Sequence, residues 1–122
     1  MSGVDGRAVI DRAAIERLTR LGGAALARQM IDLFMEHAAE RLDAVRGGVD
    51  GPDVKSAERG AHSLKSTAGN LGAERLMEAA RQVEDAASAG DHDRVAALFD
   101  TLDAALQEAL ASLRTIHAEL GT

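Results

Sequence analysis

The chain has 122 residues and a formal net charge of −6 at pH 7, and 46% of its residues are hydrophobic while only 2% are aromatic. This length fits one domain with one hydrophobic core. The sequence contains no cysteine, which excludes disulfides and thiol chemistry. Its acidic balance, with no basic run, argues against nucleic acid as a partner.

The sequence predicts helices separated by short turns. Glycine pairs at 22–23 and 47–48 are expected to end the first two helices, and Gly51-Pro52 marks a turn. Residues 1–10 are small and Gly-bearing, so we expect a flexible N-terminus. The expected helices are a short one capped by Asp11 and reaching Leu21, then ranges of about 24–46, 53–70, 73–88 and 93–119.

Apolar residues recur at helical spacing in these ranges, whereas strand formers are sparse and never alternate over a useful length. Linkers this short force neighbouring long helices to pack antiparallel. The expected fold is therefore all-α, an antiparallel up-down four-helix bundle with a short additional N-terminal helix. One domain would cover residues 11–120.

The stretch from Ala57 to Gly72 displays one histidine opposite an apolar stripe. At about 100° per residue, His62 lies roughly 140° from the centre of that stripe and is expected to face solvent. Lys65 and Ser66 follow one turn later on the polar face. The stripe consists of Ala57, Ala61, Leu64, Ala68 and Leu71.

Small residues around an exposed histidine allow a large partner to approach the ring. Ser66 lies about one turn from His62 and Gly69 about two turns away, and neither can shield the imidazole. Glycine inside a helix lowers its stability by about 1 kcal/mol relative to alanine. Close approach of a partner to the histidine would explain why a glycine stands at position 69. Lys65 is placed to stabilise a phosphoryl group on the ring as a compact cation.

The run from His62 to Gly72 resembles the signature of histidine-containing phosphotransfer (HPt) domains, roughly His-x-Leu-Lys-Gly/Ser, a few small residues and Leu-Gly. His62 matches the phosphorylated histidine and Lys65 the accompanying lysine, while Ser66 stands where glycine is common. The resemblance covers about residues 11–113. It implies a four-helix bundle with the active histidine exposed midway along one helix.

The resemblance also draws attention to Glu84. In HPt domains, and in the phosphotransfer domain of chemotaxis kinases, the matching position often carries a Glu or Gln that reaches the active imidazole. A carboxylate accepting the Nδ1 proton would leave Nε2 of His62 as the free nucleophile. A solvated glutamate beside the buried Val83 is the alternative. Arg59 and Arg75 are candidates for docking a negatively charged partner, although arginines on a helix are usually just solvated.

The other histidines, His37, His92 and His117, are expected to be ordinary surface or boundary residues. No two histidines have the i, i+4 spacing of a helical metal site, and no His-Glu-x-x-His motif occurs. We therefore expect no metal site. No glycine-rich phosphate loop or other nucleotide motif occurs either, so the chain is expected to be a phosphocarrier without kinase activity.

The sequence thus predicts a phosphorelay intermediate that receives a phosphoryl group on His62 from a receiver-domain aspartate or a kinase and passes it to another receiver aspartate. The expected partners are response-regulator receiver domains or a hybrid histidine kinase, and exposed apolar area on 24–46 and 53–70 would supply the remaining contact. The resemblance implies that the receiver brings Mg²⁺ and that this chain binds no cofactor. We expect a cytoplasmic protein, since no signal segment or membrane-spanning run is visible. We also expect it to be a monomer.

Three alternatives remain open at this point. The chain could be the phosphotransfer domain of a larger chemotaxis-type histidine kinase. It could also be a non-catalytic helical interaction module, in which the histidine is incidental, or a metal-binding bundle assembled across helices.

Overall fold

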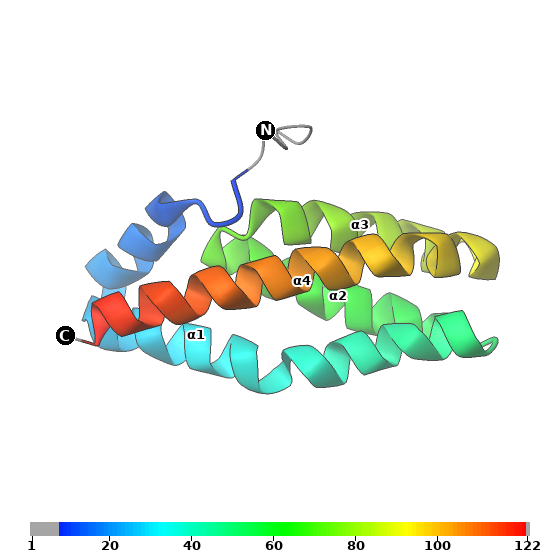
Figure 1. Ribbon diagram of the computed structural model, residues 1–122, viewed down its shortest axis with the longest axis horizontal. Helices are drawn as coiled ribbons and strands as arrows, with labels where there is room; N and C mark the ends of the chain where they lie inside the picture. Colours follow the sequence, from blue (N-terminus) through cyan, green and yellow to red (C-terminus); the bar gives the residue numbers. More distant parts are fainter. Residues whose placement is uncertain (1–7, 122) are drawn as a thin grey trace.

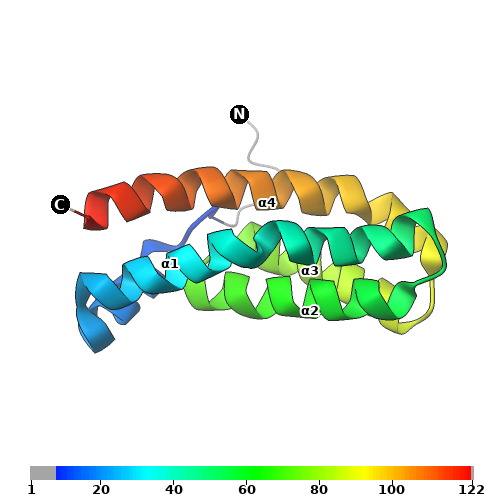
Figure 2. The same ribbon diagram turned by 90° about the horizontal axis from the view of Figure 1, so that it is seen from below.

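Four helices pack side by side in the computed structural model, which describes residues 8–121 (Figures 1 and 2). They are α1 (Arg12–Asp50), α2 (Val54–Leu71), α3 (Glu74–Ser88) and α4 (His92–Leu120). Each helix packs against the next along the chain, α1 also packs against α4, and α2 lies diagonally opposite α4. The predicted all-α bundle is confirmed, and no strand occurs among the described residues.

The α1 helix is sharply kinked, because Gly22 and Gly23 have non-helical backbone angles and Gly23 has a φ of 77°. Residues that carry a side chain rarely adopt a positive φ, whereas glycine adopts it easily. The glycine pair therefore allows the sharp bend at this point of α1. The preceding segment Arg12–Leu21, here called the arm, folds back across one end of the bundle (Figure 1). The expected short N-terminal helix is this arm.

The arm is tied to the turn between α2 and α3. The Asp11 side chain caps the arm by accepting from the backbone N–H of Ala13, and the Asp11 backbone N–H donates to the Gly72 carbonyl at 2.7 Å. Ile10, just before the cap, packs against the core. Of the N-terminus expected to be flexible, residues 1–7 lie outside the described residues.

The expectation that Gly47-Gly48 ends the long helix is wrong, because α1 continues to Asp50. Gly48 is buried against α2, and a Cβ added there would lie 2.7 Å from the Cβ of Ala57. The glycine therefore permits close packing, and the helix stops only before Pro52, which restricts the residue preceding it. Since Pro52 has no N–H for the Gly48 carbonyl, that carbonyl accepts from Nδ1 of His92 at 2.6 Å.

The core is made of the predicted apolar stripes. All five stripe residues of α2 are at most 1% exposed, and Leu76, Ala80 and Val83 of α3 face them across the interior. Burial of this face anchors α2 and fixes its rotation about its axis. Among the described helices, none is long and apolar enough to cross a membrane.

Candidate functional site

His62 projects outward from the middle of α2, and its side chain is 60% exposed. Its helical neighbours Ala61 and Leu64 are fully buried on the opposite side. The orientation predicted from helical periodicity is therefore the one the chain adopts. The imidazole is open to a partner while the helix that carries it is held firmly in the bundle.

Glu84 of α3 lies directly beside the ring, and its Oε2 is 2.7 Å from Nδ1 of His62. An ionised carboxylate can only accept hydrogen bonds, so Nδ1 carries the proton and donates it to Glu84. In the neutral ring, Nε2 then keeps its lone pair. The contact predicted between these two residues is present, and it leaves the lone pair of the outer ring nitrogen, Nε2, without a partner in the described structure.

Lys65 completes a three-residue cluster that the sequence did not reveal. Its Nζ lies 2.7 Å from Oε1 of Glu84, so each carboxylate oxygen has its own cationic or N–H partner. Partial burial raises the pKa of Glu84, but hydrogen bonds from Lys65 and His62 lower it by more, and the pKa lies below its ordinary value. Glu84 therefore stays ionised at neutral pH and keeps accepting from the ring.

The surface around the ring is open, as the small residues predicted. Ser66 and Gly69 are both exposed, and a Cβ added at Gly69 would meet only the Sδ of Met77, at 3.2 Å. Met77, on α3, is itself 37% exposed. A shallow depression of about 370 Å³ adjoins the ring, and it is lined by Glu58, Arg59, His62, Ser63 and Glu84.

The two candidate docking arginines lie in different places. Arg59 is exposed one turn before His62 and donates to the Ser56 hydroxyl at 3.2 Å, so it borders the site. Arg75 faces α4 instead, where it pairs with Glu108 at 3.4 Å. It also precedes Glu84 by nine residues, a rise of about 13 Å along α3. The structure therefore does not bring Arg75 to His62.

An apolar pocket of about 300 Å³ lies between α1 and α2, and Thr67 of α2 is among the residues that line it. Leu33, 45% exposed, stands at its edge, and His37 is half-buried within it. Helical periodicity predicts that both Leu33 and Phe34 lie on the buried side of α1, which is right for Phe34 (2% exposed) and wrong for Leu33. The pocket itself depends on how α1 packs against α2. Its lining is Met30, Leu33, Phe34, His37, Arg41, Thr67, Asn70 and Leu71.

The remaining histidines make local contacts. His92 binds the Gly48 carbonyl, and Nε2 of His117 lies 2.9 Å from Oδ1 of Asp32. Within the described part of the chain, no group of three or more His, Asp or Glu side chains is arranged to hold a metal ion.

Comparison with known proteins points to one family. The family model of the Hpt domain matches residues 29–115. The crystal structure of histidine-containing phosphotransfer protein B (HptB) from Pseudomonas aeruginosa PAO1 superposes with a TM-score of 0.83 at 20% sequence identity, covering 91% of this chain and 96% of that one. At this identity the structural match shows a shared fold. No curated protein matches the sequence significantly.

Proposed function

The chain belongs to the Hpt domain family and has a phosphotransfer role in a phosphorelay, and we propose that His62 is the residue that carries the phosphoryl group. One observation supports this assignment above all. The His62 ring faces solvent, with Nδ1 held by Glu84 at 2.7 Å and Nε2 free. None of the other three histidines combines such exposure with a carboxylate that fixes the ring.

The proposed step is an in-line displacement at phosphorus. The Nε2 lone pair of His62 attacks an aspartyl phosphate, an N–P bond forms, and the P–O bond breaks with its electron pair leaving on the donor aspartate. Positive charge develops on the ring and lies against the Glu84 carboxylate. In the onward transfer a second aspartate attacks the phosphorus, and the N–P electron pair returns to Nε2.

Glu84 and Lys65 act on this step in different ways. Glu84 fixes the Nδ1–H tautomer and balances the ring charge, so it is a positioning residue. Lys65 balances Glu84 in the free protein and is proposed to stabilise the phosphoryl oxygens when the group is bound. The receiver is proposed to bring the Mg²⁺ and the remaining catalytic groups.

The proposed docking surface extends from the ring toward α1. Ser66 and Gly69 leave room for the partner backbone, Arg59 borders the site, and the pocket at Leu33 offers apolar contact. We propose that this pocket is the exposed apolar area expected on the helices over 24–46 and 53–70. Arg75 lies outside this surface, so we leave it out of the proposal. Relay partners must separate after transfer, so the interface should be small and transient.

The assignment is tested by incubating the protein with a receiver domain that carries a labelled aspartyl phosphate. His62→Gln should fold normally and acquire no acid-labile label, whereas His117→Gln should be labelled like the wild type. Undiminished labelling of His62→Gln would refute the site.

We further propose that the protein is a phosphocarrier without kinase activity and acts as a cytoplasmic monomer. Incubation with labelled ATP alone should leave the protein unlabelled. Size-exclusion chromatography measures whether the protein is a monomer, and cell fractionation measures whether it is cytoplasmic. Self-labelling, a dimer mass or recovery outside the cytoplasm would each contradict the corresponding part.

A further inference from the structure

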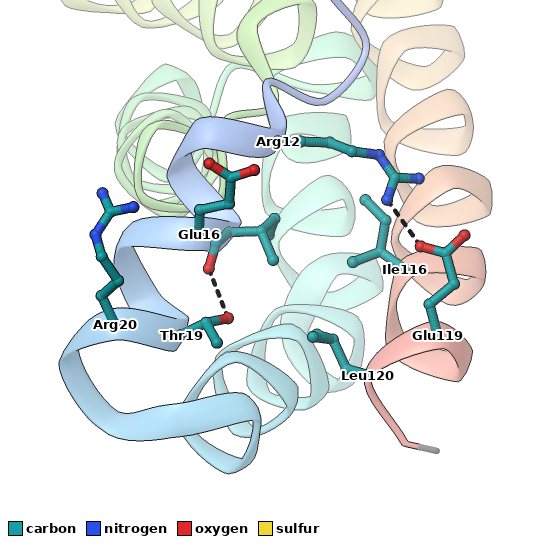
Figure 3. A pocket seen from close by; sticks show the side chains of 8 residues that line it. Arg12, Glu16, Thr19, Arg20, Ile116, Glu119 and Leu120 are labelled. Atoms are coloured by element: carbon teal, nitrogen blue, oxygen red, sulfur yellow. Dashed lines mark hydrogen bonds and ion pairs between the residues drawn. The ribbon is translucent and has the colours of Figure 1, made fainter.

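The arm is held in place by residues that lie far from it in the sequence. The Asp11 backbone N–H, just before the arm, donates to the Gly72 carbonyl, and a Cβ added at Gly72 would lie 2.9 Å from the Cβ of Ala14. On the other side, Arg12 reaches across an open pocket of about 370 Å³ to Glu119, at 2.7 Å (Figure 3). The surface that receives the arm, here called the arm site, therefore consists of the turn between α2 and α3 and the end of α4.

Two glycines with non-helical backbone angles, Gly22 and Gly23, separate the arm from the rest of α1. Gly23 has a φ of 77°, which residues with a side chain rarely adopt. Gly22 excludes a side chain for another reason, because a Cβ added there would lie 2.8 Å from the Cβ of Leu26. Leu21, at the kink, is 81% exposed, so its side chain contributes little packing to the bend. The bend therefore depends on glycine at both positions.

A straight helix would accept alanine at both positions. Cβ atoms four residues apart on a regular helix are about 5–6 Å apart, so the clash with Leu26 would disappear. Straightening would also turn the arm, which buries Ala14 and Ile15. In a straight helix these two residues would lie roughly 170° from the buried stripe that begins with Ala27 and Ile31. They would then face away from their own bundle, and another molecule would have to cover them.

We propose that Gly22-Gly23 is a hinge that keeps the arm on its own bundle, and that the arm site binds the arm of a second copy once the hinge straightens. In the bent state the arm occupies the arm site of its own chain, and the protein is the monomer proposed above. In the straight state two chains exchange arms in a two-fold dimer. The occupant is a second copy because the arm site already complements this arm, in charge at Arg12 and Glu119 and in shape at Gly72 and Ala14.

The first test compares the mass in solution of the wild type and of the double variant Gly22→Ala/Gly23→Ala, by size-exclusion chromatography with light scattering. We expect the double variant to have twice the mass of the wild type and the same helical content by circular dichroism. Gly90→Ala is the control, because Gly90 also has a positive φ, 71°, but is followed by the Asp91 cap, which begins a new helix. This control should lose stability and remain a monomer.

A second test identifies the exchange of arms itself. Chains of the double variant that also carry Arg12→Glu are unfolded and refolded together with chains that also carry Glu119→Arg. In an exchanged mixed dimer, opposite charges meet at both arm sites, whereas like charges meet in either chain alone and in every unexchanged arrangement. We expect native mass spectrometry to find more mixed dimer than random association gives.

Three results would overturn the proposal: a double variant that stays monomeric, a double variant that loses its helical content, or a random share of mixed dimer. Dimers formed equally by Gly90→Ala would also overturn it, because they would not depend on the hinge. A dimeric wild type would contradict the monomer proposed above, whereas a monomeric wild type with a monomeric double variant would contradict the hinge alone. No phosphoryl transfer is measured, so the outcome is independent of the assignment of His62.

Discussion

Glu84→Gln is the sharpest test of how the site works, because it keeps the side-chain size and removes the charge. The Glu84 side chain is only 18% exposed and contacts both Nδ1 of His62 and Nζ of Lys65 at 2.7 Å. Glutamine can still accept from the ring through its amide oxygen, but it cannot balance the positive charge that develops during transfer. It also places an N–H₂ group where Lys65 needs an acceptor.

The expected slowing of transfer is estimated from the hydrogen bond between Nδ1 of His62 and residue 84, whose acceptor is charged in the wild type and neutral in Glu84→Gln. A bond to a charged group contributes about 1.5–3 kcal/mol, compared with about 1 kcal/mol for a neutral one. The difference between the two is about 0.5–2 kcal/mol, and because the His62 side chain is 60% exposed we take a loss near the lower end, about 0.7 kcal/mol. This corresponds to about threefold slower phosphoryl transfer.

The assay is single-turnover transfer from a labelled receiver, compared with Asp85→Asn as the control. Asp85 is adjacent in sequence, 66% exposed and paired with Arg81, so its substitution removes the same charge without touching His62. Nitrogen chemical shifts should show Nδ1–H in the wild type and a tautomer mixture in Glu84→Gln. Equal transfer rates for Glu84→Gln and the wild type, or equal slowing by Asp85→Asn, would refute the role of the carboxylate.

The same variant has a defined effect on acid stability. The pKa of Glu84 is lowered from its ordinary value of 4.5 in the folded protein, so its contribution to the free energy of unfolding is present at pH values above 4.5. That contribution is lost as the pH falls through the lowered pKa. The stability difference between the wild type and Glu84→Gln should therefore be largest near neutral pH and shrink in acid, as followed by urea unfolding at several pH values.

Other substitutions test the packing and the site separately. Gly60→Ala should lower the free energy of unfolding by about 1–3 kcal/mol, because the added Cβ would lie 2.6 Å from a backbone oxygen of α1. Gly69→Ala should keep or raise stability, by up to about 1 kcal/mol, yet slow transfer by obstructing the partner. Lys65→Ala should leave the bundle folded and slow transfer, and an unchanged rate would remove the lysine from the mechanism. His92→Ala should cost about 1–2 kcal/mol by leaving the Gly48 carbonyl without its donor, and an unchanged urea midpoint would contradict this.

Features that depend on local periodicity could be predicted from the sequence. The apolar stripe of α2 repeats every three or four residues, so the outward direction of His62 follows from its position opposite that stripe. The ranges expected for α2, α3 and α4 agree with the structure to within one or two residues at each end. These elements are bounded by residues such as Asp53, Gly72 and Asp91, which act as caps in the folded chain.

Features that depend on the register between helices could not be predicted. Lys65 is placed on the polar face of α2 by periodicity, but its contact with Glu84 depends on how far α3 slides along α2. Arg75 is a candidate for docking a negatively charged partner by its charge alone, whereas the structure turns it toward Glu108 of α4. The Gly47-Gly48 pair was interpreted as a helix end because sequence alone does not show that Ala57 packs against Gly48.

Two glycines on α2 show why residue type alone does not reveal a role. Gly60 is buried, and its missing side chain lets the backbone of α1 approach. Gly69 is exposed, and beside it only Met77 would meet an added Cβ. Both glycines reduce the helix propensity of α2 by about the same amount. The favourable contact that compensates for this loss differs between them. At Gly60 it is present in the free protein as packing, whereas at Gly69 we propose that it arises when a partner docks. Opposite effects of alanine at these positions, on unfolding in one case and on transfer in the other, would therefore separate the structural surface of α2 from its functional one.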